Sequence, residues 1–240
     1  MTDIDPRRQA LREALLLWGI AFLAIVVTFT VARSLAKPVA TVAFLYLPLW
    51  AMRRRGEDYR DYGLTLRAWR EDLLLVAAVS LLVLPLFTLG FWGATAVRPH
   101  LSGWAQAFVA PLGGQSRFFH PRLPERFGLW VIDQVFVVAL PEEFFYRGYL
   151  QARLRQTWPQ GARILGATVG PAFLLVALLF ALGHLAVFQA WRLAVFFPAL
   201  LFGYLRERTG TVLGSTLLHA LFNFYAAFLE LSFTPLWQRR

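Results

Sequence analysis

Residues 128–150, GLWVIDQVFVVALPEEFFYRGYL, decide the fold class of this chain, because they place a cluster of ionisable residues inside an apolar stretch. An apolar helix of about 20 residues is long enough to cross the hydrocarbon core of a bilayer. Glu142, Glu143 and Arg147 are costly at that depth unless they face the protein interior and find partners there. The stretch therefore predicts a membrane-spanning helix whose polar residues line an interior site.

The composition of the whole chain supports the same fold class. Of its 240 residues, 58% are hydrophobic and 16% are charged, against about 25% charged residues in ordinary soluble domains. The absence of cysteine excludes a disulfide framework and thiol chemistry. We expect a single integral-membrane domain over residues 1–240, an all-α, polytopic transmembrane helix bundle. About seven spans are predicted, or eight with a re-entrant or interfacial segment in the connection 93–127, and the seven are residues 15–32, 38–52, 73–92, 129–150, 171–191, 193–205 and 212–233.

The net charge of +10 lies in the loops next to the apolar spans. This distribution suits lipid headgroups and topology signals, so membrane lipids are expected partners and nucleic acid is not. A cytoplasmic N-terminus places 15 of the 24 Lys and Arg residues on the cytoplasmic side, although Arg239 and Arg240 then lie outside. We expect a bacterial inner (cytoplasmic) membrane protein, with the basic segment 53–72 lying on the membrane surface as an amphipathic piece.

The two adjacent glutamates are expected to have different tasks. Neighbouring residues on a helix project about 100° apart, and Glu143 is placed four residues before Arg147, where the two can pair. Glu142 is then free to point elsewhere, and a carboxylate without a cation partner in an apolar cavity suits general base or acid chemistry. The alternative is a salt bridge of all three residues that ties two helices together. Pro141 lies beside the pair and is expected to kink the helix.

Two further apolar spans carry one histidine each. His184 is either a packing residue or a catalytic imidazole. His219 and Asn223 are four residues apart, so both side chains project from one helix face and can donate hydrogen bonds to one point, as a developing oxyanion requires. An interhelical hydrogen-bond patch is the alternative. Asp133 is interpreted as structural, and His100 and His120 as solvated loop residues.

Three spans of one bundle can bring a carboxylate, an imidazole and two donors to one cavity. The chain has no G-x-S-x-G, no cysteine, no H-E-x-x-H and no pair of spans with a central aspartate each. Serine, thiol, zincin and aspartyl types of intramembrane proteolysis are therefore disfavoured. Water activated by a carboxylate remains as the chemistry that these residues can support.

These residues resemble the CPBP family of intramembrane proteases, which includes the CAAX-processing endopeptidase and bacterial relatives linked to bacteriocin immunity and protein sorting. The family pattern is E-E-x-x-x-R, then F-x-x-x-H, then H-x-x-x-N or H-x-x-x-D on separate membrane helices. This chain has PEEFFYRGYL at 141–150, FALGH at 180–184 and HALFN at 219–223. The resemblance covers about residues 129–233, which we take as the motif-bearing core.

The resemblance implies an endopeptidase that cleaves near the C-terminal or membrane-anchored tail of a protein, including lipidated ones. Glu142 would deprotonate the attacking water, His184 would hold it, and His219 with Asn223 would stabilise the oxyanion. Glu143 and Arg147 would brace the site. No cofactor is expected, because Asn223 has a clear role as a donor and none as a zinc ligand. A zinc ion on Glu142, His184 and His219 is the alternative.

Two readings of the function remain open beside this one. The chain could be a non-enzymatic transporter, or an immunity or scaffold protein that retains the fold, since intramembrane Glu, Arg and His also relay protons. The absence of an internal repeat argues against a transporter. The substrate could be either a prenylated tail or a sorting tail. For hydrolysis, we expect a polar cavity that opens toward the cytoplasm and laterally between helices.

Overall fold

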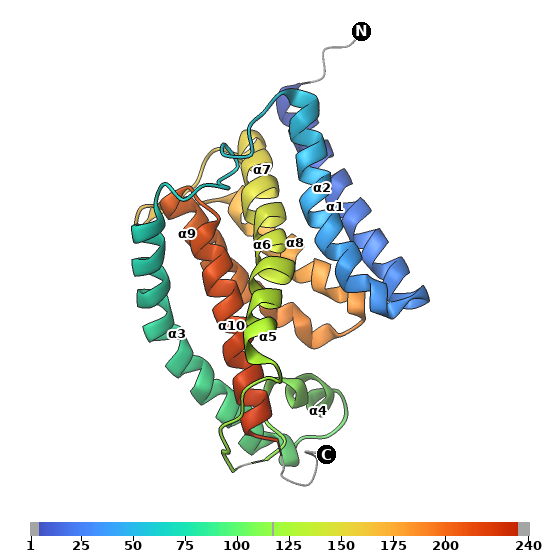
Figure 1. The fold of residues 1–240 in the computed structure, drawn as a ribbon, viewed down its shortest axis with the longest axis vertical. Coiled ribbons are helices and arrows are strands. Elements are labelled where there is room, and N and C mark those ends of the chain that lie inside the picture. The colour runs from blue at the N-terminus through green and yellow to red at the C-terminus, as the bar shows by residue number, and fades with distance from the viewer. Residues whose placement is uncertain (1–4, 117, 235–240) are drawn as a thin grey trace.

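The computed structural model describes residues 5–116 and 118–234, which form a bundle of long helices with one short β-hairpin (Figure 1). The all-α expectation is thus wrong at one place, where β1 (Ala162–Ile164) pairs antiparallel with β2 (Ala167–Val169). The two linking residues, Leu165 and Gly166, have φ of 46° and 87°. Positive φ at both positions is the type I′ turn that matches the twist of a two-residue hairpin.

Three N-terminal helices are long and apolar enough to cross a membrane: α1 (Pro6–Val31), α2 (Ala36–Arg55) with the short turn η1 (Arg33–Leu35) before it, and α3 (Trp69–Val97). Within the described residues no other helix meets both criteria, so the expected count of seven spans is not confirmed. Polar side chains explain part of this result. For example, α10 (Leu213–Ser232) has 20 residues but carries His219, Asn223 and Glu230.

The extracytoplasmic-side connection predicted at residues 93–127 contains only short elements. These are η2 (Arg98–His100), α4 (Gly103–Val109) and η3 (Ala110–Leu112). Helix α4 has seven residues, too few to cross a bilayer.

The glutamate-bearing segment is one continuous helical run made of five parts: α5 (Phe127–Asp133), η4 (Gln134–Ala139), α6 (Leu140–Glu143), η5 (Phe144–Leu150) and α7 (Gln151–Thr157). Both η4 and η5 are π-helical. Pro141 lies in the first turn of α6, so the disturbance that was expected beside it takes the form of a changed hydrogen-bond register. π-Helical turns inside α-helices occur frequently at functional sites, and here they flank both glutamates.

The fifth and sixth predicted spans are a shorter helical hairpin. Helix α8 (Pro171–Gly183) has 13 residues and α9 (Phe196–Thr209) has 14, so each rises about 20 Å in a core about 30 Å thick. The 3₁₀ turns η6 (His184–Val187) and η7 (Ala190–Val195) connect them inside the bundle (Figure 1). His184 therefore lies at the turn and not in the middle of a span, as the apolar run had suggested.

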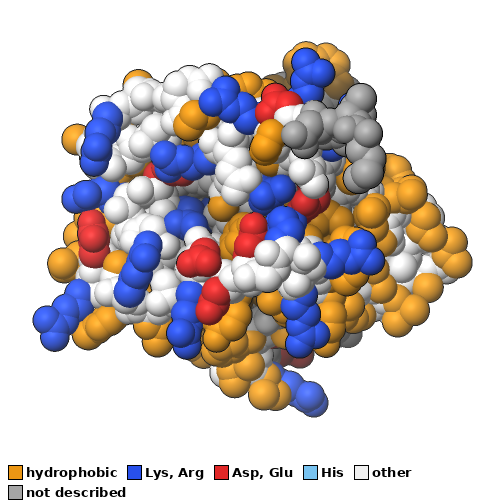
Figure 2. Space-filling view, turned by 90° about the horizontal axis from the view of Figure 1, so that it is seen from above, with side chains coloured by type: hydrophobic (Ala, Val, Ile, Leu, Met, Phe, Trp, Pro, Cys, Tyr) orange, Lys and Arg blue, Asp and Glu red, His pale blue; other side chains and the backbone are white. Residues whose placement is uncertain are grey.

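One end of the bundle is basic. Arginines end α2 (Arg53, Arg54 and Arg55) and α9 (Arg206 and Arg208), and Figure 2, which looks onto this end, shows Lys and Arg side chains across it. The segment between α2 and α3 forms turns at this end, and its expected position on the membrane surface stays a prediction. Tyr62 holds it in place, because this buried ring stacks on Tyr149 of η5 at 5.6 Å.

Candidate active site

A cavity of about 360 Å³ lies between the helical run 127–157, the turn of the α8–α9 hairpin and α10. It is lined by every residue that was predicted to be catalytic and by six others. The full set is Gln134, Val138, Glu142, His184, Arg192, His219, Asn223, Ala226, Ala227 and Glu230.

The two glutamates point in different directions, as their spacing predicts. Glu143 is fully buried, and its Oε1 accepts a hydrogen bond from Arg147 Nη1 at 3.2 Å. Glu142 faces the cavity with a side chain that is 19% exposed. Its Oε2 is buried and has no hydrogen-bond partner among the described residues. A buried polar atom without a partner requires an explanation, and a ligand or water in the cavity supplies one.

Arg147 connects this helical run to α9. Its Nη2 donates to the carbonyl of Ala199 at 3.2 Å, and its guanidinium lies 4.2 Å from the ring centroid of Phe180. Arg206 of α9 donates in turn from Nε to the carbonyl of Arg147. A desolvated guanidinium over an aromatic face is a favourable contact, so the cation is held on three sides beside Glu143.

His219 lies between the two glutamates. Its Nδ1 is 2.9 Å from Glu143 Oε1, while its Nε2 is 4.0 Å from Glu142 Oε2, which is too long for a hydrogen bond. An ionised carboxylate only accepts, so Nδ1 carries the proton toward Glu143 and Nε2 faces the cavity. The ring stacks on Phe202 at 5.0 Å, which fixes its plane. The contact between Glu143 and His219 joins residues 76 positions apart and has no signal in the local sequence.

His184 is held by a local contact. Its Nδ1 lies 2.9 Å from the carbonyl oxygen of Phe180. Because a carbonyl only accepts, Nδ1 carries the proton, and this assigns the Nε2 lone pair of the neutral ring to the cavity. The adjacent Gly183 leaves no room for a side chain, since an added Cβ would collide with the Tyr146 hydroxyl. These contacts explain the F-x-x-x-H motif and its glycine. The Phe180 carbonyl orients the His184 ring, and the glycine lets the hairpin turn pack against Tyr146.

Two residues of the cavity were missed from the sequence. Gln134 accepts a hydrogen bond from Asn223 Nδ2 at 3.0 Å and so orients the amide. Gln134, Val138 and Glu142 follow each other at intervals of four, a pattern that could have indicated a shared helix face. Arg192 had no expected role, and the short hairpin brings it to the cavity, where its Nε donates to Gln189.

The other polar residues lie where the sequence indicated. Asp133 pairs with Lys37 of α2, and His100 and His120 are exposed. In residues 5–116 and 118–234, no three His, Asp or Glu side chains lie close enough to hold one metal ion. The alternative of a zinc ion on Glu142, His184 and His219 stays a prediction.

The cavity does not extend in the expected direction. From Glu142 and His219 it runs along the first part of the helical run and the last part of α10, toward Glu230. These parts lead to the end of the bundle opposite the basic one (Figure 1). The residues that line the cavity therefore lie away from the basic end, toward which its opening was expected.

Three comparisons with known proteins gave one match, to a family model. No curated protein and no solved structure matches the chain significantly. The family model described as type II CAAX prenyl endopeptidase Rce1-like matches residues 124–225. These residues include all three motifs, Gln134 and Arg192, whereas α1, α2 and α3 lie before them. The match supports placing this part of the chain in the CPBP/CAAX protease family.

Proposed function

We propose that this chain is an intramembrane endopeptidase that hydrolyses a peptide bond near the membrane-anchored or lipidated tail of a protein. The observation that carries the proposal is the cavity itself, which brings Glu142, His184, His219 and Asn223 together and leaves Glu142 without a hydrogen-bond partner among the described residues. A carboxylate free to accept a proton, beside imidazoles fixed in orientation, suits the activation of water.

In the proposed reaction, Glu142 takes a proton from water while the water oxygen attacks the scissile carbonyl carbon. His184 accepts a hydrogen bond from that water at Nε2, because its Nδ1 is held by Phe180. The carbon–nitrogen bond then breaks, and Glu142 gives the proton to the leaving amine. The products are a carboxyl group and an amine, with Glu142 returned to its starting state.

The charge that develops on the carbonyl oxygen requires donors at the opposite side of the site. The Asn223 amide, oriented by Gln134, supplies one. His219 supplies another from Nε2 when its imidazole enters the reaction with a proton on both nitrogens and keeps them throughout, with Nδ1 held by Glu143. Arg147 and Glu143 keep this imidazole in place, and no step requires a metal ion.

The test compares two carboxylates of the same cavity. Glu142→Gln keeps the size of the side chain and removes the base, whereas Glu230→Gln makes the same change at the far end of the cavity. Each variant is expressed in a deletion strain, and new protein termini in the membrane fraction are quantified. Glu142→Gln should reduce cleavage by about 10² to 10⁴-fold, and Glu230→Gln should retain it at equal protein level.

Equal termini in the wild type and Glu142→Gln would reject hydrolysis. If the deletion phenotype were still restored by both proteins, the chain would act as a non-enzymatic transporter, immunity factor or scaffold. A loss of termini in both variants alike would show that charge in the cavity, and not a base at position 142, is required.

A further inference from the structure

Among the described residues, those of the two long helices that line the cavity all lie toward one end of the bundle, and this limits the class of substrate. On the helical run 127–157, the cavity is lined by Gln134, Val138 and Glu142 and by nothing that follows Glu142. On α10 it is lined from His219 to Glu230 and by nothing that precedes His219. The two helices run antiparallel, so both sets lie on the same side of the reacting groups.

The opposite direction is closed by packed side chains. All seven residues of η5, Phe144–Leu150, are buried, including the side chain of Arg147 at 0% exposure. Phe180 and Phe202 contact the His219 ring from this side. Ser215 and Leu218, which precede His219 on α10, are also at 0%. Because protein interiors are close-packed, these buried residues separate Glu142 from the basic end.

The basic end marks the cytoplasmic side. Arginines concentrate at the ends of α2 and α9, and Figure 2 shows many basic side chains on this face, with acidic ones between them. Segments rich in Lys and Arg next to membrane helices stay in the cytoplasm. The cavity leads away from this face to the end where α5 begins and α10 ends, with Glu142 about 20 Å from Phe127 along the helix.

We propose that the cavity opens on the extracytoplasmic side of the membrane and takes translocated, membrane-anchored tails. This inference rests on the proposed function and makes it more specific. A prenylated C-terminal Cys-a-a-X tail is made and held on the cytoplasmic side, where the packed half of the bundle separates it from Glu142. The substrate is instead a protein whose anchor is already inserted and whose scissile bond lies outside the cytoplasm.

The chain has no cysteine, so single cysteines report accessibility directly. Ala227→Cys places a thiol on the cavity wall. Asp58→Cys, exposed between α2 and α3, marks the basic end, and Ser102→Cys, exposed just before α4, marks the opposite end. Leu218→Cys is the buried control. A membrane-impermeant maleimide is added either to spheroplasts or to inverted membrane vesicles.

We expect Ala227→Cys and Ser102→Cys to react at least ten times faster in spheroplasts, and Asp58→Cys to react at least ten times faster in inverted vesicles. Reaction of Ala227→Cys together with Asp58→Cys would overturn the proposal, as would no reaction of Ala227→Cys from either side. Labelling of Ser102→Cys from the cytoplasm would also overturn the proposal, because it would show that the end opposite the basic one faces the cytoplasm. Because labelling needs no catalysis, the same pattern in the Glu142→Gln background keeps this result separate from a failure of the proposed function.

Discussion

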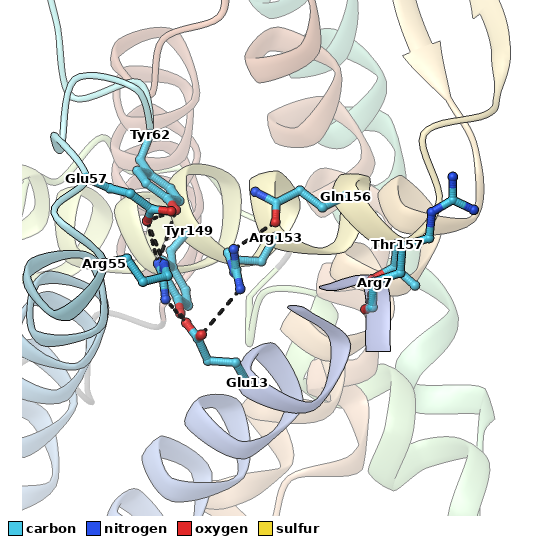
Figure 3. Close-up of polar contacts among 9 residues, drawn as sticks. All are labelled: Arg7, Glu13, Arg55, Glu57, Tyr62, Tyr149, Arg153, Gln156 and Thr157. Atoms are coloured by element: carbon cyan, nitrogen blue, oxygen red, sulfur yellow. Dashed lines mark hydrogen bonds and ion pairs between the residues drawn. The ribbon is translucent and has the colours of Figure 1, made fainter. Parts of the chain in front are cut away.

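Two partly buried carboxylates of the same bundle show how differently a membrane protein can treat an acid. Glu13 of α1 accepts hydrogen bonds at both oxygens, from Arg55 and Tyr149 at Oε1 and from Arg153 at Oε2 (Figure 3). Glu142 accepts none from the described residues, and its nearest basic atom, His219 Nε2, is 4.0 Å away. The first acid has its hydrogen-bonding capacity used by the fold, and the second has it available.

This difference separates structural from chemical roles. Glu13 joins α1 to α2 and to the helical run 127–157, since Arg55 belongs to α2, Tyr149 to η5 and Arg153 to α7. Satisfied polar networks of this kind make a fold rigid and specific, whereas an unsatisfied buried group costs stability. Glu142 therefore weakens the protein slightly, and the proposed reaction gives a reason for that cost.

The largest effect on stability is expected at Glu143. This acid is hydrogen-bonded by the fold, as Glu13 is, and it lies beside the site, as Glu142 does. Glu143→Ala leaves fully buried Arg147 without its carboxylate and His219 Nδ1 without its acceptor. Removing one partner of a buried pair costs about 3–5 kcal/mol. The measurement is the unfolding transition in detergent, and Glu143→Gln, which keeps an acceptor oxygen, should lose less. A stable Glu143→Ala would show that Arg147 does not depend on this pair.

The next effect tests the comparison itself. Glu13→Gln should lower the free energy of unfolding by about 2 kcal/mol, because hydrogen bonds to a charged group are lost. Glu142→Gln should leave it unchanged or raise it slightly, because an unpaired buried charge is removed. The two melting curves, recorded in the same detergent, give the comparison. A larger loss in Glu142→Gln than in Glu13→Gln would reverse the assignment of structural and chemical roles.

Much of the site could be predicted from local spacing. The angle between neighbouring helix positions separated Glu142 from Glu143, and the interval of four paired Glu143 with Arg147 and aligned His219 with Asn223. These relations stay within one helical turn, so they do not depend on how the helices pack. The structure shows each of them.

The predictions that failed depend on how the helices pack against one another. Residues 171–205 were divided between two spans at Arg192, and only Gly183 indicates that the first helix already ends before His184. The turn also brings Arg192 to the cavity. The direction of the cavity also could not be predicted, because it depends on which half of two antiparallel helices is packed. Hydropathy reports how apolar a segment is and carries no information on that packing.

A smaller effect is expected at Gln134, which orients the proposed oxyanion donor. Gln134→Leu frees the Asn223 amide and should lower kcat about tenfold, or about 1.4 kcal/mol, with little change in KM. Gln134→Glu keeps an acceptor for Asn223 Nδ2 and should recover most of the activity. If both variants behave alike, or if KM alone rises, Gln134 contributes to substrate binding and not to the position of Asn223.

The smallest effect is expected at Glu57, which shares Arg55 with Glu13 and makes the stability of the protein depend on pH. Burial acts to raise the pKa of Glu57, but hydrogen bonds from Arg55 at 2.8 Å and Tyr62 at 2.6 Å outweigh it, so the pKa lies below its ordinary 4.5. Burial also raises the pKa of Tyr62 to about 12, so its hydroxyl remains a donor throughout the acid range.

A group whose pKa is lowered by folding contributes stability above its unfolded pKa and loses it as the pH falls through the folded value. The wild type should therefore be more stable than Glu57→Gln at pH 7 and melt at a higher temperature. The difference in the free energy of unfolding should be at most about 1 kcal/mol, because the pair is partly exposed. Below about pH 4 the two melting temperatures should converge. High salt should reduce the difference at pH 7 as well. A difference that persists at low pH would mean that the shape of the Glu57 side chain, and not its charge, holds this turn against the bundle.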